Sequence, residues 1–139
     1  MIGDFQLESS ERYDEFLSEI GVNWFVRQIV TRMEPIQKVR QVGNEVQIQT
    51  VTAFTDTTTR FQLEVPYTEN IADSNIPTMA KLDGDKLLRF RSPSTDSGIE
   101  KEINEVREYP ENGNKMVLTL TIPDKPEVWT KRIFKRIEN

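Results

Sequence analysis

Apolar and polar residues alternate along much of the chain after Lys38, which is the pattern of a β-strand that buries one face. The alternation is clear at residues 46–49, 61–65 and 116–122. Turn sequences separate such segments at Gly43-Asn44, Asp83-Gly84 and Asn112-Gly113-Asn114. No helix-length apolar pattern follows Lys38, so the helical crossovers that parallel strands need are not indicated there. The sequence therefore predicts an antiparallel sheet.

The polar content of these predicted strands favours a barrel over a sandwich. Short strands joined by hairpin turns fit either architecture. Five of the six residues from 54 to 59 are threonine or aspartate, however, and a dry sandwich core would accept them only if each were paired. We therefore expect an all-β barrel around a cavity that contains water.

Two short helices are predicted near the start of the chain. Apolar residues recur at helical spacing at Tyr13, Phe16, Leu17 and Ile20, and again at Val26, Ile29, Val30 and Met33. The first helix is expected at residues 11–20, with Ser10 as its cap and Gly21 as its stop. The second is expected to begin after its cap, Asn23, and to end before Pro35. The result is a helix-turn-helix about residues 10–33.

A helix-turn-helix can bind DNA, but this one does not have the required surface. A recognition helix needs polar side chains toward the base edges, whereas the second helix carries Trp24, Phe25 and an apolar stripe. The net charge of −5 also argues against a nucleic-acid partner. The stretch from Arg27 to Arg40 is locally basic, which indicates either a solvated face or transient contact with anionic membranes.

The composition narrows the function classes further. A length of 139 residues fits a single domain, 1–139. The chain has no cysteine and no histidine, so disulfides, thiol catalysis and the commonest transition-metal ligand are excluded. No apolar run reaches bilayer length, and the first residues lack a signal peptide's basic start and apolar core. We expect a cytoplasmic location, with secretion after removal of a signal peptide left open.

The last predicted strand, residues 128–136, holds the most informative side chains. Arg132 and Phe134 are two residues apart and share one face of the strand. If that face points inward, a guanidinium is buried, which is costly unless an anion meets it. Arg107 is a second candidate from an earlier strand. Two inward arginines would form a receptor for a carboxylate.

The order and spacing of several segments resemble the intracellular lipid-binding proteins, the fatty-acid-binding and cellular retinoid-binding group. The segments that carry the resemblance are residues 3–7, 9–17, 21–22, 52–54, 72–73, 81–87 and 130–134. The resemblance implies a ten-stranded antiparallel up-and-down barrel, the β-clam, with a helix-turn-helix lid between the first two strands. The ligand would lie inside.

In this family an arginine and a tyrosine on the last strand, with a second arginine on an earlier strand, usually bind the ligand carboxylate. Arg132 matches the first arginine and Arg107 the second, while Phe134 replaces the tyrosine. Phenylalanine at this place resembles the retinol-binding branch, which however has glutamine where this chain keeps Arg132. Because a charge-assisted hydrogen bond is stronger than a neutral one, an acid ligand is favoured over an alcohol.

The resemblance also implies a set of cavity-lining residues. They are Tyr13, Phe16, Val30, Pro35, Phe54, Ala72, Asp73 and Leu118. Each could instead be an ordinary core residue, and Phe54 is expected at the portal opposite the lid. Arg89 and Arg91 alternate with Leu88 and Phe90, so one strand face carries both arginines. An outward charged pair is the ordinary interpretation. If the pair points inward, Arg91 is an additional anion partner.

The function expected from these observations is a non-enzymatic intracellular carrier, a monomer without cofactor or metal, that binds a long-chain fatty acid or a similar hydrophobic carboxylate. The alternatives are a retinoid carrier of the same fold and a scaffold that uses the barrel surface for interactions. A glycosidase with paired acids is disfavoured, because no spacing motif places two carboxylates across a cleft.

Overall fold

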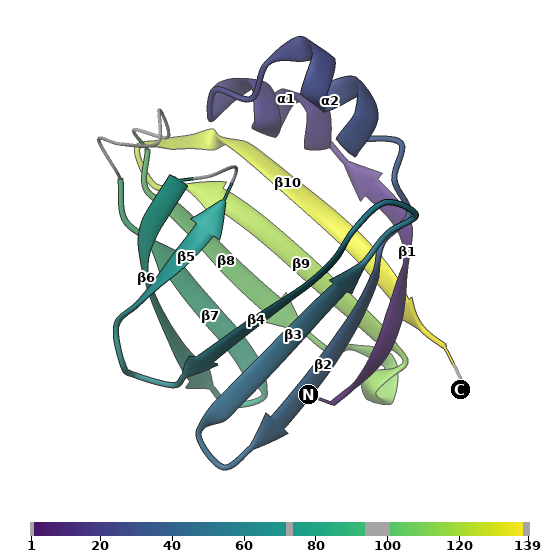
Figure 1. Ribbon diagram of the computed structural model, residues 1–139, viewed down its shortest axis with the longest axis vertical. Helices are drawn as coiled ribbons and strands as arrows, with labels where there is room; N and C mark the ends of the chain where they lie inside the picture. The colour runs from purple at the N-terminus through teal and green to yellow at the C-terminus, as the bar shows by residue number, and fades with distance from the viewer. Residues whose placement is uncertain (1, 72–73, 94–100, 138–139) are drawn as a thin grey trace.

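The computed structural model describes residues 2–71, 74–93 and 101–137. Ten strands form one antiparallel sheet in the order β4-β3-β2-β1-β10-β9-β8-β7-β6-β5 (Figure 1). The strands are β1 (Gly3–Glu11), β2 (Ile36–Val42), β3 (Glu45–Val51), β4 (Asp56–Gln62), β5 (Tyr67–Ile71), β6 (Ser74–Asp83), β7 (Lys86–Arg91), β8 (Ile103–Glu108), β9 (Lys115–Ile122) and β10 (Lys125–Arg136). The predicted antiparallel barrel is confirmed.

The barrel is nearly but not fully closed. The sheet order begins at β4 and ends at β5, and these two strands approach each other at one side of the barrel (Figure 1). Within the described residues β4 pairs with β3 and β5 pairs with β6, with no ladder between β4 and β5. The barrel wall is therefore open between β4 and β5 within the described residues.

Two helices, α1 (Tyr13–Glu19) and α2 (Trp24–Val30), connect β1 to β2 and cover one end of the barrel (Figure 1). The predicted cap of α2 is confirmed, since the backbone N–H of Val26 donates to Asn23 Oδ1 at 2.9 Å. Its predicted end near Met33 is wrong. The backbone N–H of Met33 bonds to the carbonyl of Val30, three residues earlier, so the chain forms tighter turns there and α2 ends at Val30.

The predicted cap of the first helix is also wrong. Ser10 lies in β1, where it pairs with Arg132 of β10, and the residue before α1 is Arg12 in a left-handed conformation with φ 57°. Pairing with β10 continues to Glu11 and therefore outweighs the local helix signal, and α1 begins two residues later than the sequence pattern predicts. The consequence is that Ser10 belongs to the barrel wall.

The hairpin turns lie where the sequence predicts them. Gly43 and Gly84 have φ of +59° and +64°, which residues with a side chain rarely adopt. The alternation at residues 61–65 does not continue as a strand, because β4 ends at Gln62 and the chain turns toward β5. Val65 is 51% exposed, so its predicted inward position is wrong.

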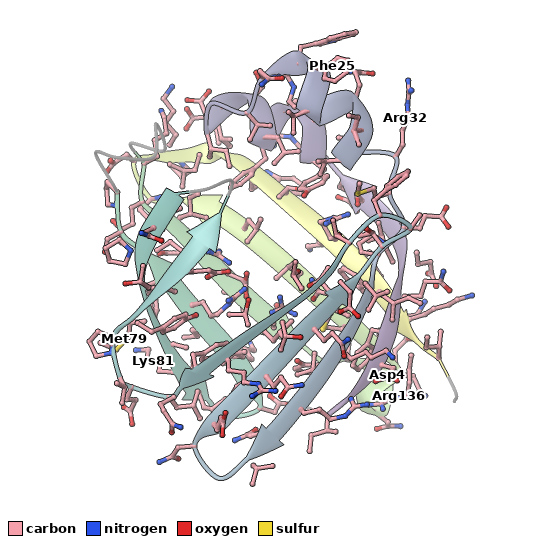
Figure 2. The ribbon with its side chains drawn as sticks, viewed as in Figure 1. Asp4, Phe25, Arg32, Met79, Lys81 and Arg136 are labelled. Carbon is pink, nitrogen blue, oxygen red and sulfur yellow. The ribbon has the colours of Figure 1, made fainter. Side chains whose placement is uncertain are left out.

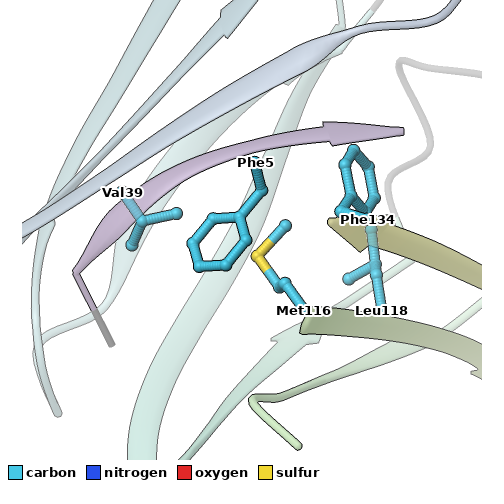
Figure 3. Packing of buried hydrophobic residues seen from close by; sticks show 5 residues of the cluster. All are labelled: Phe5, Val39, Met116, Leu118 and Phe134. Carbon is cyan, nitrogen blue, oxygen red and sulfur yellow. The ribbon is translucent and has the colours of Figure 1, made fainter. Parts of the chain in front are cut away.

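Apolar side chains fill the end of the barrel that lies away from the helices. Figure 3 shows the cluster of Phe5, Val39, Met116, Leu118 and Phe134, and the pairing of Phe5 with Arg136 places it near the chain termini. Figure 2 labels Arg136 at the opposite end of the molecule from the α2 residue Phe25. The space that remains open lies between this cluster and the lid.

Candidate ligand-binding site

A cavity of about 400 Å³ lies between the helices and the barrel interior. This volume is in the range of small-molecule sites, about 300 to 1,000 Å³. Four apolar side chains of the lid helix and its end form one wall, Tyr13, Phe16, Leu17 and Ile20. Further apolar lining comes from strands β3, β8 and β9, at Ile48, Ile103, Leu118 and Leu120. The remaining lining is polar, and it includes four arginines.

Arg132 of β10 is a buried cation that faces this cavity. Arg132 is only 8% exposed, and in the sheet it lies opposite Leu118 of β9 on one side and Ser10 of β1 on the other. Its Nε donates to Ser10 Oγ at 3.2 Å, and its guanidinium carbon lies 4.0 Å from the centre of the Tyr13 ring. Among the described residues no carboxylate comes within 4.0 Å of it.

The environment of Arg132 disfavours its charge. Burial lowers the pKa of its guanidinium, and the only opposing influence is the nearby Tyr13. A protonated guanidinium with one neutral hydrogen-bond partner and an aromatic face is only partly compensated for its lost hydration. The arrangement is suited to receive an anion from the cavity.

A second group of arginines surrounds a single buried carboxylate, Glu105 of β8. Arg89 of β7 donates to both of its oxygens at 2.6 and 2.9 Å. Arg91 donates at 3.1 Å and Arg107 at 2.8 Å. Glu105 thus accepts charge-assisted bonds from three guanidinium groups. Because it is only 2% exposed, bulk water has little access to these bonds.

Two further side chains extend this network across the barrel. Glu69 of β5 lies 3.2 Å from Arg89 and 3.4 Å from Arg91. On the opposite wall, Gln37 of β2 accepts from Arg107 Nη1 at 2.6 Å. The polar network thus runs from β2 through β8 and β7 to β5, and it forms the floor of the cavity above the apolar cluster.

The network determines the charge states of its members. Burial by itself would raise the pKa of Glu105, but the charges of Arg89, Arg107 and Arg91 outweigh it and hold that pKa well below the ordinary value. Burial would likewise lower the pKa of Arg89, and Glu105 and Glu69 raise it well above its ordinary value. Glu105 is therefore ionised and Arg89 is protonated at neutral pH.

The structure brings together half of the residues predicted for the site. Those that line the cavity are Tyr13, Phe16, Arg91, Arg107, Leu118 and Arg132. The interpretation of Arg89 and Arg91 as an outward pair is wrong, because both are buried and point inward. Arg107 also points inward, but its guanidinium already has Glu105 and Gln37 as partners.

The other predicted residues lie elsewhere. Phe134 is fully buried in the apolar cluster below the cavity, and Pro35 is buried outside the cavity lining. Val30 is half-buried at the end of α2, and Phe54 is 80% exposed in the β3–β4 loop, next to a hollow lined by Ile29 and Met33. Ala72 and Asp73 lie outside the described residues.

Sequence reasoning did not include Glu105, Glu69, Arg89 and Gln37 among the site residues. One signal was present, because Ile103, Glu105 and Arg107 alternate along one strand and therefore share a face. An inward Arg107 requires an inward Glu105. No comparable signal pointed to Glu69 or Gln37, which join the network only through pairing across the barrel.

The lid is attached to the barrel rim by an ionic contact. Glu19 at the end of α1 accepts from Lys101 at 2.9 Å and from Lys125, in the β9–β10 hairpin, at 2.5 Å. The pKa of Glu19 is lowered to about 2, because Lys125 and Lys101 donate hydrogen bonds to its carboxylate. The contact therefore persists across the physiological pH range.

Replacing Glu19 with glutamine should loosen the lid, because α1 loses its charged contacts with both lysines. We expect faster amide hydrogen exchange in α1, with unchanged exchange in β9 and β10, measured by mass spectrometry. Glu15→Gln is the matched control, since within the described residues Glu15 pairs only with Arg12, three residues earlier. Equal acceleration in the two variants would show that the contact with the rim does not hold the lid.

No family model matches the chain. The fatty acid-binding protein of Tyrophagus putrescentiae is 29% identical over 136 residues, which cover 96% of this chain and 95% of that protein. Sodium/calcium exchanger regulatory protein 1 of Doryteuthis pealeii is 28% identical over 139 residues, which cover 99% of this chain and 97% of that protein.

Solved structures of similar proteins superpose over nearly the full chain. The REP1-NXSQ fatty acid transporter gives a TM-score of 0.85 at 27% identity and covers 99% of this chain and 96% of its own. The fatty acid-binding protein from brain tissue of Drosophila melanogaster gives 0.81 at 28% identity, with 95% of both chains covered. The resemblance predicted from the sequence is thereby confirmed: in fold and in sequence, over almost its whole length, the chain is similar to the fatty-acid-binding and lipid-binding proteins.

Proposed function

We propose that the protein is a non-enzymatic carrier that binds a long-chain fatty acid, or a similar hydrophobic carboxylate, inside the barrel. The observation that carries the proposal is Arg132, a buried cation that faces the cavity without a carboxylate partner among the described residues. The fatty-acid-binding and fatty-acid-transporting relatives support the same class of ligand.

The affinity would come mainly from the apolar chain of the ligand. Each methylene group moved from water into the cavity contributes about 0.8 kcal/mol. The apolar residues of α1 and β9 provide the surface that receives it. The carboxylate would pair with Arg132, which fixes the direction in which the chain enters and selects acids over neutral lipids.

A titration of the unchanged protein with three matched ligands tests this function. Hexadecanoic acid should bind more tightly than its methyl ester and than hexadecanol, because only the acid pairs with Arg132. Lipid extraction of the freshly purified protein, followed by mass spectrometry, should yield fatty acids that are chemically unaltered. Failure of all three ligands to bind would contradict the carrier function, and conversion of the acid would contradict its non-enzymatic nature.

The retinoid carrier is the second candidate within the same fold. The acid form, a retinoate, would use the same cation at Arg132, whereas retinol would leave that cation without an anion. The scaffold alternative predicts that no lipid co-purifies with the protein. The lipid extraction therefore separates the three alternatives by whether a lipid is present and by its mass. Native mass spectrometry of the intact protein tests the proposed monomer.

The lid is the proposed place of transient contact with anionic membranes. Trp24 and Phe25 of α2 are 64% and 68% exposed, and Figure 2 shows Phe25 and Arg32 directed away from the barrel. Arg27 is not available in the same way, because its Nε donates to Asp14 at 2.9 Å and its Nη1 to the carbonyl of Val22 at 2.7 Å. Arg32 is the exposed base of this surface.

Replacing Arg32 with glutamate should slow the transfer of a fluorescent fatty acid to anionic vesicles. Each basic residue near such a surface contributes about 1 kcal/mol, and the attraction is screened by salt. Arg60→Glu is the control, because it makes the same charge change on an exposed residue of β4, toward the other end of the barrel. Equal transfer rates for both variants, at low and high salt, would contradict a contact through the lid.

The described residues include no helix that is both long and apolar enough to cross a membrane. A cytoplasmic location is part of the proposal and is tested by fractionation of the source cells.

A further inference from the structure

The cavity lining carries more positive charge than a single carboxylate can neutralise. Its charged side chains within the described residues are Arg89, Arg91, Arg107, Arg132, Glu69 and Glu105. Four positive charges against two negative charges leave a net charge of +2. All six side chains are at most 12% exposed, so bulk water screens them poorly. Buried charges are costly unless they are paired.

One excess charge belongs to Arg132 and the other to the floor network. Within that network, Glu105 already accepts four hydrogen bonds from three arginines, which fills its capacity. Arg91 is the most weakly bound of the three. Its contacts with Glu69 are 3.4 and 3.5 Å long, and its Nη1 has no hydrogen-bond partner in the part of the chain that the structure describes.

The two excess charges lie on different parts of the cavity wall. Arg132 is on β10 and pairs with Leu118, whereas Arg91 is on β7 and pairs with Ile103. Strands β8 and β9 separate them in the sheet. The surface between them includes the apolar side chains of Leu118 and Leu120. Three strand spacings of about 4.8 Å separate the backbones of β10 and β7 along this wall, which favours an apolar chain with an acidic group at each end over a single compact group.

We propose that the preferred ligand is a long-chain dicarboxylate, with one carboxylate on Arg132 and the other on Arg91. This inference rests on the proposed function and narrows it, since the fatty acid is replaced by an acid that is oxidised at its far end. Arg91 then acts as a specificity-determining residue, while Arg132 is common to both classes of ligand.

The test compares three ligands of equal chain length on the unchanged protein by calorimetric titration. Hexadecanedioic acid should bind about tenfold more tightly than its monomethyl ester, because only the diacid forms the second charge-assisted bond. Hexadecanoic acid should behave like the monoester. If hexadecanoic acid binds but the diacid binds no more tightly than its monomethyl ester, this inference alone is overturned. Failure of all three to bind would overturn the carrier function as well.

Substitutions of Arg91 locate the second carboxylate. Arg91→Gln should remove the advantage of the diacid over its monoester, and Arg91→Lys, which keeps the charge, should retain most of it. Thermal unfolding of both variants reports whether they fold, and the ligand comparison on the unchanged protein does not depend on them. An advantage that survives Arg91→Gln would overturn the assignment of Arg91.

Hexadecyl phosphate tests whether the spacing of the charges matters. It carries close to two negative charges on one compact group. Because that group can meet only one of the two separated cations, hexadecyl phosphate should bind no more tightly than the monoester of the diacid. Binding as tight as that of the diacid would overturn the separated arrangement.

Discussion

Replacing Glu105 with glutamine is expected to lower the free energy of unfolding by about 3 to 5 kcal/mol, the range for removing one partner of a buried ion pair. Glu105 is 2% exposed and is the shared acceptor of Arg89, Arg91 and Arg107. Glutamine has nearly the same shape but no charge, so Arg89 and Arg91 would keep only the carboxylate of Glu69, and Arg107 would keep only neutral partners such as Gln37. Urea unfolding measures the loss.

Glu108→Gln is the matched control for this prediction. Glu108 follows on the same strand but is 43% exposed, and its only salt bridge to another described residue is a 3.5 Å contact with Lys86. Exposed pairs of this kind contribute about 0 to 1 kcal/mol. Similar losses in the two variants would show that burial does not make Glu105 critical.

The effect of Glu105→Gln should also depend on pH. The pKa of Glu105 is held well below its ordinary value in the folded protein, so its contribution is complete above the unfolded-state pKa of about 4.3. That contribution is lost as the pH falls through the folded-state pKa, because the protonated carboxyl resembles the amide. The difference between parent and variant should therefore narrow below about pH 4. A constant difference would contradict an electrostatic origin.

The strands, turns and helices of the barrel were predictable because their signals are local and agree with one another. Alternation, turn glycines and the helical stripes each fix a conformation over a few residues, and Gly43 and Gly84 lie at the turns they indicate. The wrong predictions occur where strand pairing or the path of the chain outweighs a local conformational preference. Ser10 is a good helix cap by type, yet its pairing with Arg132 keeps it in β1. The alternation through Val65 stops because the chain must turn after β4.

The site was predictable only in part, and charge explains why. Arg132 was found because it shares a face with Phe134 and matches an arginine of the family that the sequence resembles. Charged residues are usually exposed, and this general rule favoured an outward position for Arg89 and Arg91. Their inward position is stabilised by Glu105, which comes from the next strand, and by Glu69, two strands away in the other direction. The arginines and the carboxylates that pair with them are on three different strands, so no single segment of the sequence shows that the buried positive charges are paired.

Replacing Arg132 with glutamine is expected to have opposite effects on stability and on ligand binding. Fatty acids should lose about 1.5 to 3 kcal/mol of binding free energy, the range for a hydrogen bond to a charged group, while the matching alcohols should lose much less. The protein without ligand should not be destabilised and should gain stability, because burial already lowers the pKa of Arg132 and no carboxylate partner is present in the described residues.

This pair of effects distinguishes a binding residue from a structural one. Removing the partner of a structural arginine destabilises the fold, as Glu105→Gln is expected to do. Arg132, by contrast, has within the described residues only Ser10 as a hydrogen-bond partner, and its guanidinium carbon lies 4.0 Å from the centre of the Tyr13 ring and 5.8 Å from that of Phe134. Lys135→Gln provides the control, since it removes a charge from an exposed residue of the same strand and should change neither quantity. Calorimetric titration with acid and alcohol, together with urea unfolding of each variant, measures both. Equal losses for acid and alcohol would remove Arg132 as the carboxylate partner, and a large loss of stability would give it a structural role instead.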